Sequence, residues 1–547
     1  MKIHPSLNLK LIALLLLWLF VTVINLNKAY HIDDTVHLET AQWILQEPLR
    51  PMSGQINWDE NTGPIHLLNQ PHFYFYLLAV WGSLWGFGEL QMHLFHSLFT
   101  LACIIFIYLI AKVIIPSRAF LLTALLTLSP AFVVGQNLMV DIPLLSFWLA
   151  FFYAMIKPKV QSEKLYFILA GFMAGFACLI KYSSLPLIVV MLSYLIIRRR
   201  FHLIWTVSIP VLMLIIWSCF NYLDYGSIHI FDRPSKDFSL RRVIEMALSF
   251  LLCLGGILPY SPIYLRNLWH KKKLNLLIKI TLVIILIFSA IIIAGVYMRR
   301  IGEPIINNYL VFLFYGNGIA VTILLSKFFL RNLETIFAEN GKTILLLYLW
   351  IFFGALFTII FAPFMATRHV LLVIVPITLL LLYFTERSHS LGWNITMLLS
   401  TALLTLVLSI SDRIWANFYR EKAALIRNEL PSEANVYFTG HWGWQWYAKK
   451  NGMKQLEALN PRVQPGDYLV YPEGIHQQTL ENIPPEFQLK VVKKYTAKRT
   501  RAIFFSTRGE AAIFYLSDFL SPPWTVTWHP IPPIVVYRIE TRTAQQK

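Results

Sequence analysis

The chain has 547 residues, of which 57% are hydrophobic and only 14% are charged. Soluble globular proteins carry about 25% charged residues, so this composition excludes a soluble enzyme, a disordered chain and a fibrous one. It predicts a polytopic membrane protein with a soluble part. The formal net charge is +18, but the basic residues are scattered between apolar runs, so we expect contacts with membrane lipids and no binding of nucleic acid.

Apolar segments recur along the first three quarters of the chain, and a crossing helix needs roughly 20 such residues. No small-residue cleavage site follows the first segment, so we interpret it as a retained span with a cytoplasmic N-terminus. We predict fourteen apolar segments, at residues 9–27, 72–87, 92–115, 119–136, 140–157, 165–181, 184–197, 203–220, 244–264, 274–298, 309–327, 343–361, 369–386 and 393–411.

Loop charges set the expected orientation of these segments, because cytoplasmic loops are rich in Lys and Arg. The first span ends outside and Lys157 lies in a basic, cytoplasmic loop, so an odd number of crossings must separate them. Four apolar segments lie between, so one of them, either 72–87 or 119–136, fails to cross fully. We therefore predict about 13 transmembrane helices, with the N-terminus inside and the C-terminus outside. The loops predicted to be cytoplasmic are 157–164, 198–200, 270–273 and 327–331.

The polar tail does not continue the membrane segments. It starts with a helical stretch, 412–430, and a second helix is expected at 443–450. We divide the chain into a membrane domain, 1–411, with an external loop at 28–71, and an extracytoplasmic α/β domain, 412–547. Short β-branched and aromatic runs predict strands at 435–438, 468–471, 491–492, 502–505, 512–515 and 534–537.

An acidic pair, Asp33-Asp34, follows directly on the first span. Carboxylates at a membrane surface are costly unless they bind something or accept a proton. Apolar residues recur at near-helical spacing after the pair, so a helix lying on the interface is expected there. The alternative is that both acids only cap this helix, a position that Asp favours. The same alternative holds for Asp141, which begins an apolar span and precedes Pro143.

Cations at external span ends run against the usual charge bias of membrane proteins. Lys181-Tyr182 lies in a predicted external hairpin, and Arg368-His369 and Arg299-Arg300 lie at external span ends. A phosphate at the outer surface would explain them, because Arg matches phosphate oxygens with two parallel hydrogen bonds. The alternative is that these side chains reach for lipid headgroups.

Histidines share the first external loop with the acidic pair, but their spacing matches no metal motif. The four are His31, His37, His66 and His72. We therefore predict no required metal and no cofactor.

The order of these motifs resembles that of the GT-C membrane glycosyltransferases that use polyprenyl-phosphate sugars. These include protein O-mannosyltransferases, lipid A aminoarabinose transferases and their bacterial family-39 relatives. Four stretches carry the resemblance: Asp33-Asp34-Thr-Val-His37-…-Ala41, Gln70-Pro71-His72-Phe-Tyr-Phe-Tyr, Gly175-Phe-Ala-Cys-Leu-Ile-Lys181-Tyr182 and Arg368-His369-Val-Leu-…-Pro376.

This resemblance implies a catalytic role for the acidic pair, with Asp33 as the general base. It implies that Lys181 and Arg368 face the donor phosphate, and we add Arg299 and Arg300 to that group. The same resemblance places four residues in or near the substrate pocket: Asp141, His37, His72 and Tyr182. The implied reaction moves a hexosyl or pentosyl group from a polyprenyl-phosphate sugar to a lipid, glycan or protein acceptor. It is a direct displacement with inversion, at the outer face of the inner (plasma) membrane.

Two other classes of function compete with a glycosyltransferase. A transporter or flippase of a lipid-linked sugar also needs many spans, but it favours inverted repeats and charges near mid-membrane. A structural subunit would keep the fold without the chemistry. The clustering of ionisable residues at the outer face favours the enzyme over the transporter, and the presence of Asp33, Lys181 and Arg368 together argues against the structural subunit.

Overall fold

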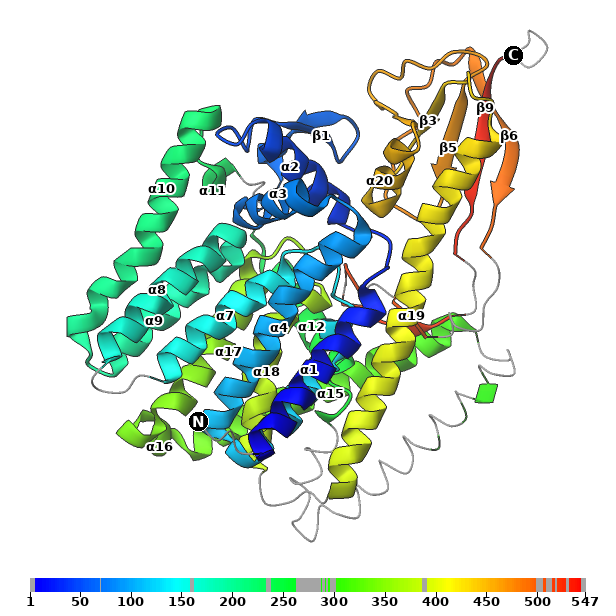
Figure 1. Cartoon of the computed structure of the whole chain (residues 1–547). Helices are drawn as coiled ribbons and strands as arrows, with labels where there is room; N and C mark the ends of the chain where they lie inside the picture. Colours follow the sequence, from blue (N-terminus) through cyan, green and yellow to red (C-terminus); the bar gives the residue numbers. More distant parts are fainter. Residues whose placement is uncertain are drawn as a thin grey trace.

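The structure, a computed structural model, is mainly α-helical, with a sheet close to the C-terminus (Figure 1). The residues that it describes are 5–68, 70–157, 162–232, 238–261, 302–385, 391–497, 505–507, 514–516, 519–527 and 531–542, with the single positions 287, 291, 294 and 295. The predicted span at 274–298 therefore falls almost entirely outside the described residues.

Long helices form a body in which they run side by side between a lower end, where the N-terminus lies, and an upper end (Figure 1). Among the described residues, seven helices are long and apolar enough to cross a membrane, and four shorter helices are apolar. The predicted polytopic helical fold is thus confirmed. The main helices are α1 (Pro5–Asn25), α4 (Glu89–Ile114), α7 (Asp141–Ile156), α8 (Glu163–Ile180), α9 (Leu185–Ile197), α10 (Ser208–Tyr225), α12 (Leu240–Ile257), α15 (Glu303–Arg331), α17 (Lys342–Phe361), α18 (Thr367–Phe384) and α19 (Leu391–Glu429).

Helix α18 is the core of this body. Its most apolar window is 83% buried inside the protein, whereas the windows of the other long helices are 17–44% buried. It contacts α7, α12, α15 and α17. A helix surrounded by other helices is apolar on all sides, as the run from Val370 to Leu382 is. Packing on every side therefore fixes the position of Arg368, near the upper end of α18.

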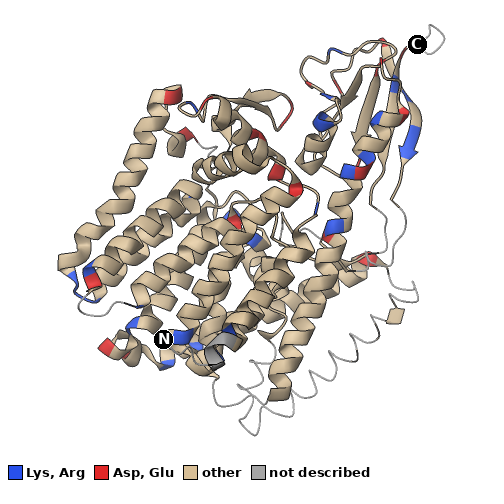
Figure 2. Ribbon diagram, viewed as in Figure 1, with Lys and Arg blue, Asp and Glu red and all other residues tan. Residues whose placement is uncertain are grey.

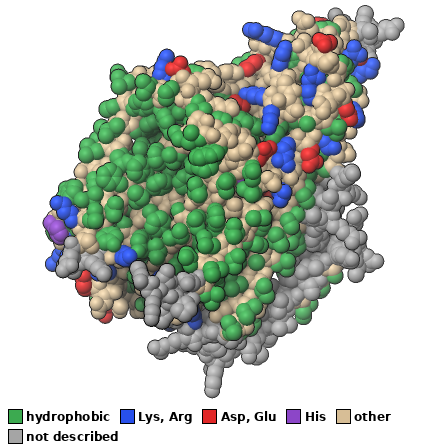
Figure 3. Space-filling view, in the orientation of Figure 1, with side chains coloured by type: hydrophobic (Ala, Val, Ile, Leu, Met, Phe, Trp, Pro, Cys, Tyr) green, Lys and Arg blue, Asp and Glu red, His purple; other side chains and the backbone are tan. Residues whose placement is uncertain are grey.

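The outside of the helical body is apolar. Figure 3 shows hydrophobic side chains over most of this face, whereas charged side chains gather on the C-terminal lobe and at the lower edge. Leu212, Ile216 and Leu223 on α10 are among the exposed ones. An apolar surface of this extent on a folded protein is typical of contact with a membrane. The ribbon in Figure 2 shows the same separation, with few charges along the middle of the helices.

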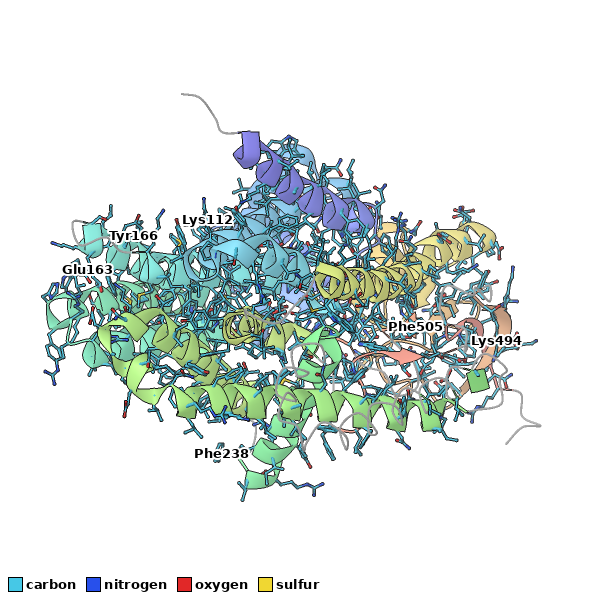
Figure 4. All side chains as sticks on the ribbon, turned by 90° about the horizontal axis from the view of Figure 1, so that it is seen from below. Lys112, Glu163, Tyr166, Phe238, Lys494 and Phe505 are labelled. Atoms are coloured by element: carbon cyan, nitrogen blue, oxygen red, sulfur yellow. The ribbon has the colours of Figure 1, made fainter. Side chains whose placement is uncertain are left out.

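The described parts of the basic loops lie together at the lower end. Arg200 lies 3.6 Å from Glu163 and 3.8 Å from Glu339, so it joins the start of α8 to the loop before α17. Figure 4 views the molecule from below and labels Lys112 on α4 with Glu163 and Tyr166 on α8. These loops share one face, as the charge pattern predicts.

Helix α3 (Phe73–Trp85) matches the predicted segment 72–87 but begins and ends at the upper end. Just before it, Gln70 lies 3.1 Å from His37, and just after it, Tyr30 donates to the carbonyl of Phe87. Its 13 residues span about 20 Å, less than the roughly 30 Å of a bilayer core. Of the two predicted candidates, this segment is the one whose helix stays at the upper end of the body.

The segment 119–136 folds as two short helices, α5 (Ala119–Thr127) and α6 (Pro130–Val133), which are broken at Pro130. It connects the lower end of α4 to the upper end of α7, so it must traverse the body. If α3 does not cross, then α4, the segment 119–136 and α7 make the odd number of crossings that the loop charges predict.

A small layer covers the upper end of the body. It contains α2 (Asp34–Gln46), which packs on α3, and a hairpin of β1 (Gln55–Asn57) and β2 (Thr62–Pro64). Val36, Ile56 and Ile65 form its own apolar cluster. Helix α2 is the one expected after the acidic pair.

The C-terminal lobe contains a mixed five-stranded sheet in the order β4-β3-β5-β9-β6. The predicted strands at 435–438, 468–471, 491–492 and 534–537 fall in it, and the helix expected at 443–450 is α20 (Trp442–Lys450). The strands are β3 (Val436–Phe438), β4 (Lys454–Gln455), β5 (Tyr468–Pro472), β6 (Phe487–Tyr495) and β9 (Ile534–Thr541).

Helix α19 runs through the predicted boundary at 411/412 as one helix of 39 residues. In addition, β7 (Phe505–Ser506) and β8 (Thr525–Val526) pack on α19 and α15 of the helical body. The indole of Trp524 donates to the carbonyl of Gly256 in α12. The tail is therefore a lobe with a segment, 505–527, whose described residues return to the membrane helices.

Candidate active site

Four charged side chains that are far apart in the sequence meet at the upper end of the helical body. Lys181 Nζ lies 3.0 Å from Asp141 Oδ1, and Arg368 Nη1 lies 3.0 Å from Asp33 Oδ2. Arg368 Nε lies 3.9 Å from Asp141 Oδ2, which links the two pairs. The structure thus brings together two predicted acids and two predicted cations.

Each of the four stands at the end of a helix. Asp33 precedes α2, Asp141 begins α7, Lys181 follows α8, and Arg368 is the second residue of α18. Helix dipoles favour acids at N-termini and cations at C-termini, so three of the four sit favourably. Arg368 is a cation at an N-terminus, and the two carboxylates beside it compensate for that.

The capping alternative for the two acids does not match their geometry. In the described structure, the Asp33 side chain makes no capping hydrogen bond with α2 and is paired with Arg368 instead. Asp141 lies inside α7, whose N-cap is Val140, and it accepts a hydrogen bond from Lys181. Both carboxylates are therefore directed at the cations.

The backbone just before Asp33 is strained. Ile32 has a φ of +50°, in the left-handed region that β-branched residues avoid, and it is buried. Such a conformation costs about 1–3 kcal/mol and persists only where the surroundings enforce it. The packing around residues 28–34 therefore determines where the Asp33 carboxylate points.

The cluster opens into a cavity of about 300 Å³ between α2, α17 and α18. Asp33 is 24% exposed and Asp141 only 6%, so Asp33 is the more accessible of the two carboxylates. The side chains of Lys181 and Arg368 are 17% and 12% exposed and meet carboxylates, which argues against the lipid-headgroup alternative. The polar and aromatic lining includes Asp33, His37, Trp58, Gln70, Lys181, Ser183, Thr358, Phe364, Arg368 and His369.

His37, a predicted pocket residue, lines this cavity. Its Nδ1 lies 3.0 Å from the Leu138 carbonyl, and its Nε2 lies 3.1 Å from Gln70 Oε1. Burial lowers the pKa of His37, so its ring is neutral near pH 7. His37 therefore offers the cavity a hydrogen-bonding edge and no charge.

Four predicted residues lie outside the lining of the cavity: Asp141, Asp34, His72 and Tyr182. Asp34 is fully buried and accepts a hydrogen bond from the His31 backbone N–H, and its catalytic role stays a prediction. Burial raises the pKa of Asp34 to about 8. His72 and Tyr182 are buried behind the cavity next to Trp217, whose indole donates to the Tyr182 hydroxyl.

Arg299 and Arg300, the other predicted phosphate ligands, lie outside the described residues. Within the described part of the chain, no group of three His, Cys, Asp or Glu side chains is arranged to hold a metal ion.

The structure adds residues that the sequence did not single out. Trp58 lines the cavity from the β1–β2 loop, and the Phe364 ring lies 5.4 Å from the Arg368 guanidinium. Lys28 and Asp412 form a buried ion pair below the acidic pair. In the sequence, only one feature could have pointed to this pair. Lys28 and Asp412 are charged residues beside apolar runs, and such charges are costly unless they are paired.

Comparison with known proteins gives one family match. Residues 69–222 match the family model described as dolichyl-phosphate-mannose-protein mannosyltransferase. This match confirms the predicted resemblance to membrane glycosyltransferases. It covers the stretches around Gln70 and Lys181, whereas Asp33 and Arg368 lie outside it. No match was found among curated proteins.

Two solved structures are similar to most of the chain. ArnT from Cupriavidus metallidurans, bound to undecaprenyl phosphate, is 15% identical with a TM-score of 0.44, over 98% of both chains. The oligosaccharyltransferase AglB from Archaeoglobus fulgidus, in complex with an inhibitory peptide and a dolichol-phosphate, is 11% identical with a TM-score of 0.43. That similarity covers 84% of this chain and 69% of AglB.

Proposed function

We propose that this protein is a membrane glycosyltransferase that moves a sugar from a polyprenyl-phosphate donor to an envelope acceptor. The observation that carries the proposal is the cavity in which the accessible carboxylate of Asp33 meets the guanidinium of Arg368. A general base and a phosphate-binding cation side by side are what this transfer requires. The family match over residues 69–222 supports the same reaction class.

The donor phosphate is proposed to bind Arg368 and Lys181. Both cations are neutralised by Asp33 and Asp141, so an incoming phosphate competes with these carboxylates. Asp141 is nearly buried between the cations and stays in place. Asp33 is the more exposed partner and is released as the phosphate takes the guanidinium. Donor binding then frees the base for catalysis.

The chemical step is a direct displacement. A nucleophilic hydroxyl of the acceptor gives its proton to the Asp33 carboxylate while its oxygen attacks the anomeric carbon of the sugar. The bond between that carbon and the phosphate oxygen breaks, and the electron pair leaves with the polyprenyl phosphate. Arg368 and Lys181 stabilise the charge that develops on the leaving group. One displacement inverts the anomeric configuration.

The site lies at the end opposite the basic loops, and this supports a reaction at the outer face of the inner membrane. In that orientation the C-terminal lobe is periplasmic or extracellular. The acceptor is proposed to be a lipid, glycan or protein that approaches from the same side.

The proposal is tested with the purified protein in detergent. Radiolabelled undecaprenyl-phosphate sugars, both hexoses and pentoses, are incubated with the protein and with membranes as a source of acceptor. We expect one donor to be consumed, with label in the acceptor and undecaprenyl phosphate released. If no donor of the panel is consumed and undecaprenyl phosphate does not bind, the proposal is wrong.

A further inference from the structure

A buried polar network lies beneath the candidate site, and neither the proposed reaction nor the sequence motifs use it. Lys28 Nζ donates to Asp412 Oδ2 and to Asn137 Oδ1, each at 2.5 Å. Lys28 and Asp412 are 1% exposed. Within the C-terminal segment, the hydroxyl groups of Tyr515 and Thr507 donate to Asp412, both at 2.8 Å.

We propose that this network, with Tyr515 at its centre, positions the charged residues of the proposed active site. It consists of Lys28, Asn137, Asp412, Thr507 and Tyr515. The inference rests on the proposed transferase function. It adds that the segment with Thr507 and Tyr515, some 480 residues after Asp33, helps to position the catalytic groups. These are positioning residues, because none of them lines the cavity.

The first argument is where the network attaches. Lys28 lies five residues before Asp33, and Asn137 lies four residues before Asp141. Asn137 Nδ2 also donates to the Tyr515 hydroxyl at 3.0 Å, so this one hydroxyl connects the approaches to both carboxylates. A shift of Tyr515 is therefore transmitted to Asp33 and to Asp141 together.

The same segment also holds the start of α18. The carbonyl of Phe514, next to Tyr515, accepts hydrogen bonds from the Thr367 hydroxyl at 3.0 Å and from its backbone N–H at 3.4 Å. Thr367 directly precedes Arg368. Residues 514 and 515 thus touch the neighbours of three of the four charged site residues.

The second argument is the strained backbone between the network and Asp33. Ile32 keeps its positive φ only because the chain on both sides is fixed. On one side are Lys28 and His31, whose imidazole lies 3.7 Å from Asp412 Oδ1. Loosening the network is therefore expected to let Ile32 relax and to turn Asp33 away from the reacting proton.

The Tyr515→Phe variant tests the proposal, since it removes the hydroxyl and keeps the ring that packs edge-on against His31. The matched control is Tyr437→Phe, which loses a hydroxyl hydrogen bond to Arg462 elsewhere in the C-terminal lobe. The readouts are transfer from the undecaprenyl-phosphate sugar that the wild type consumes and binding of undecaprenyl phosphate.

For Tyr515→Phe we expect kcat to fall by roughly tenfold, because small misplacements of a reacting group are costly. The Kd for undecaprenyl phosphate should stay within about twofold, and the control should match the wild type. If both hydroxyl groups have only a structural role, Tyr515→Phe and Tyr437→Phe should both have a lower Tm. The kcat of the folded fraction should then be unchanged in both. A wild-type kcat in Tyr515→Phe overturns the inference.

A second variant covers the case in which Tyr515→Phe does not fold. Lys28→Met with Asp412→Asn removes both buried charges and keeps one amide oxygen in place of the two carboxylate oxygens that accept from Thr507 and Tyr515. Removing both charges of a buried pair is often neutral for stability. We expect a folded protein with reduced kcat, and wild-type kcat would overturn the inference. If the wild type itself transfers nothing, the proposed function fails, which this design distinguishes from failure of the network alone.

Discussion

Arg368 Nη1 lies 3.0 Å from Asp33 Oδ2, although the two residues are 335 positions apart. Asp33 ends the turn after the first helix, and Arg368 begins the most buried helix of the body. The pair therefore connects the outer layer to the core and places the proposed base and the proposed phosphate ligand at one cavity wall. The predictions below follow from this arrangement.

Removal of either cation should weaken use of the donor. We expect Arg368→Ala and Lys181→Ala to lower kcat/KM and to raise the apparent donor KM. The loss of a charge-assisted hydrogen bond costs about 1.5–3 kcal/mol, roughly ten- to a hundredfold. Arg368→Lys should rescue only partly, because an ammonium cannot reproduce the two-pronged guanidinium contact.

The control for these variants is Arg50→Ala, which removes a mostly exposed cation from the external loop 28–71. Transfer is measured against the concentration of the undecaprenyl-phosphate sugar in detergent. Wild-type donor dependence in both Ala variants would assign Lys181 and Arg368 a structural role only.

The buried carboxyl of Asp34 should make stability fall as pH rises. Its pKa is about 8 in the folded protein and about 4 in an unfolded chain, so between these values the folded state holds a proton that the unfolded state releases. Stability is therefore highest below about pH 4 for this group and declines by up to about 1.4 kcal/mol per pH unit until about pH 8.

Asp34→Asn removes this titration and keeps the shape of the side chain. We expect the variant to lose less Tm than the wild type between about pH 5 and about pH 8. The measurement is thermal unfolding in detergent across that range, with the exposed Asp59→Asn as the matched substitution. Parallel Tm curves for Asp34→Asn and the wild type would show that this carboxyl does not titrate in that window.

The orientation predicted from loop charges places the C-terminus outside the cytoplasm. A reporter that is active only in the cytoplasm, fused after Lys547, should stay silent, and the same reporter fused after Arg200 should be active. A strong signal from the C-terminal fusion would invert the orientation and move the candidate site to the cytoplasmic face.

Much of the helical body could be predicted from the sequence, because crossing helices are recognised by apolar length and loop charge alone. The parity argument named 72–87 as one of two candidates, of which one fails to cross, and α3 stays at the upper end. The sequence did not show that one helix, α19, passes through the predicted boundary at 411/412, because α19 is apolar in its first part and polar later, and helices continue through such a change.

The charged residues of the site could be predicted from the sequence, but the residues that surround and position them could not. Asp33, Asp141, Lys181 and Arg368 stood out because charges beside apolar spans are costly, and they do meet. Asp34 has the same local signal as Asp33, and only its burial against His31 separates the two. Trp58 and Tyr515 could not be recognised from the sequence as residues near the site. Aromatic residues are abundant in this chain, and their positions depend on long-range packing.

The assignment of Asp33 as the base is the central claim, and Asp33→Asn tests it most directly. The variant keeps the shape of the side chain and cannot accept the proton. The measurement is single-turnover transfer from the undecaprenyl-phosphate sugar used by the wild type, with the protein saturated by donor. We predict a loss of at least about a hundredfold, with undecaprenyl phosphate binding kept and Asp34→Asn and Asp59→Asn much less affected. Transfer by Asp33→Asn at the wild-type rate would contradict the assigned chemistry.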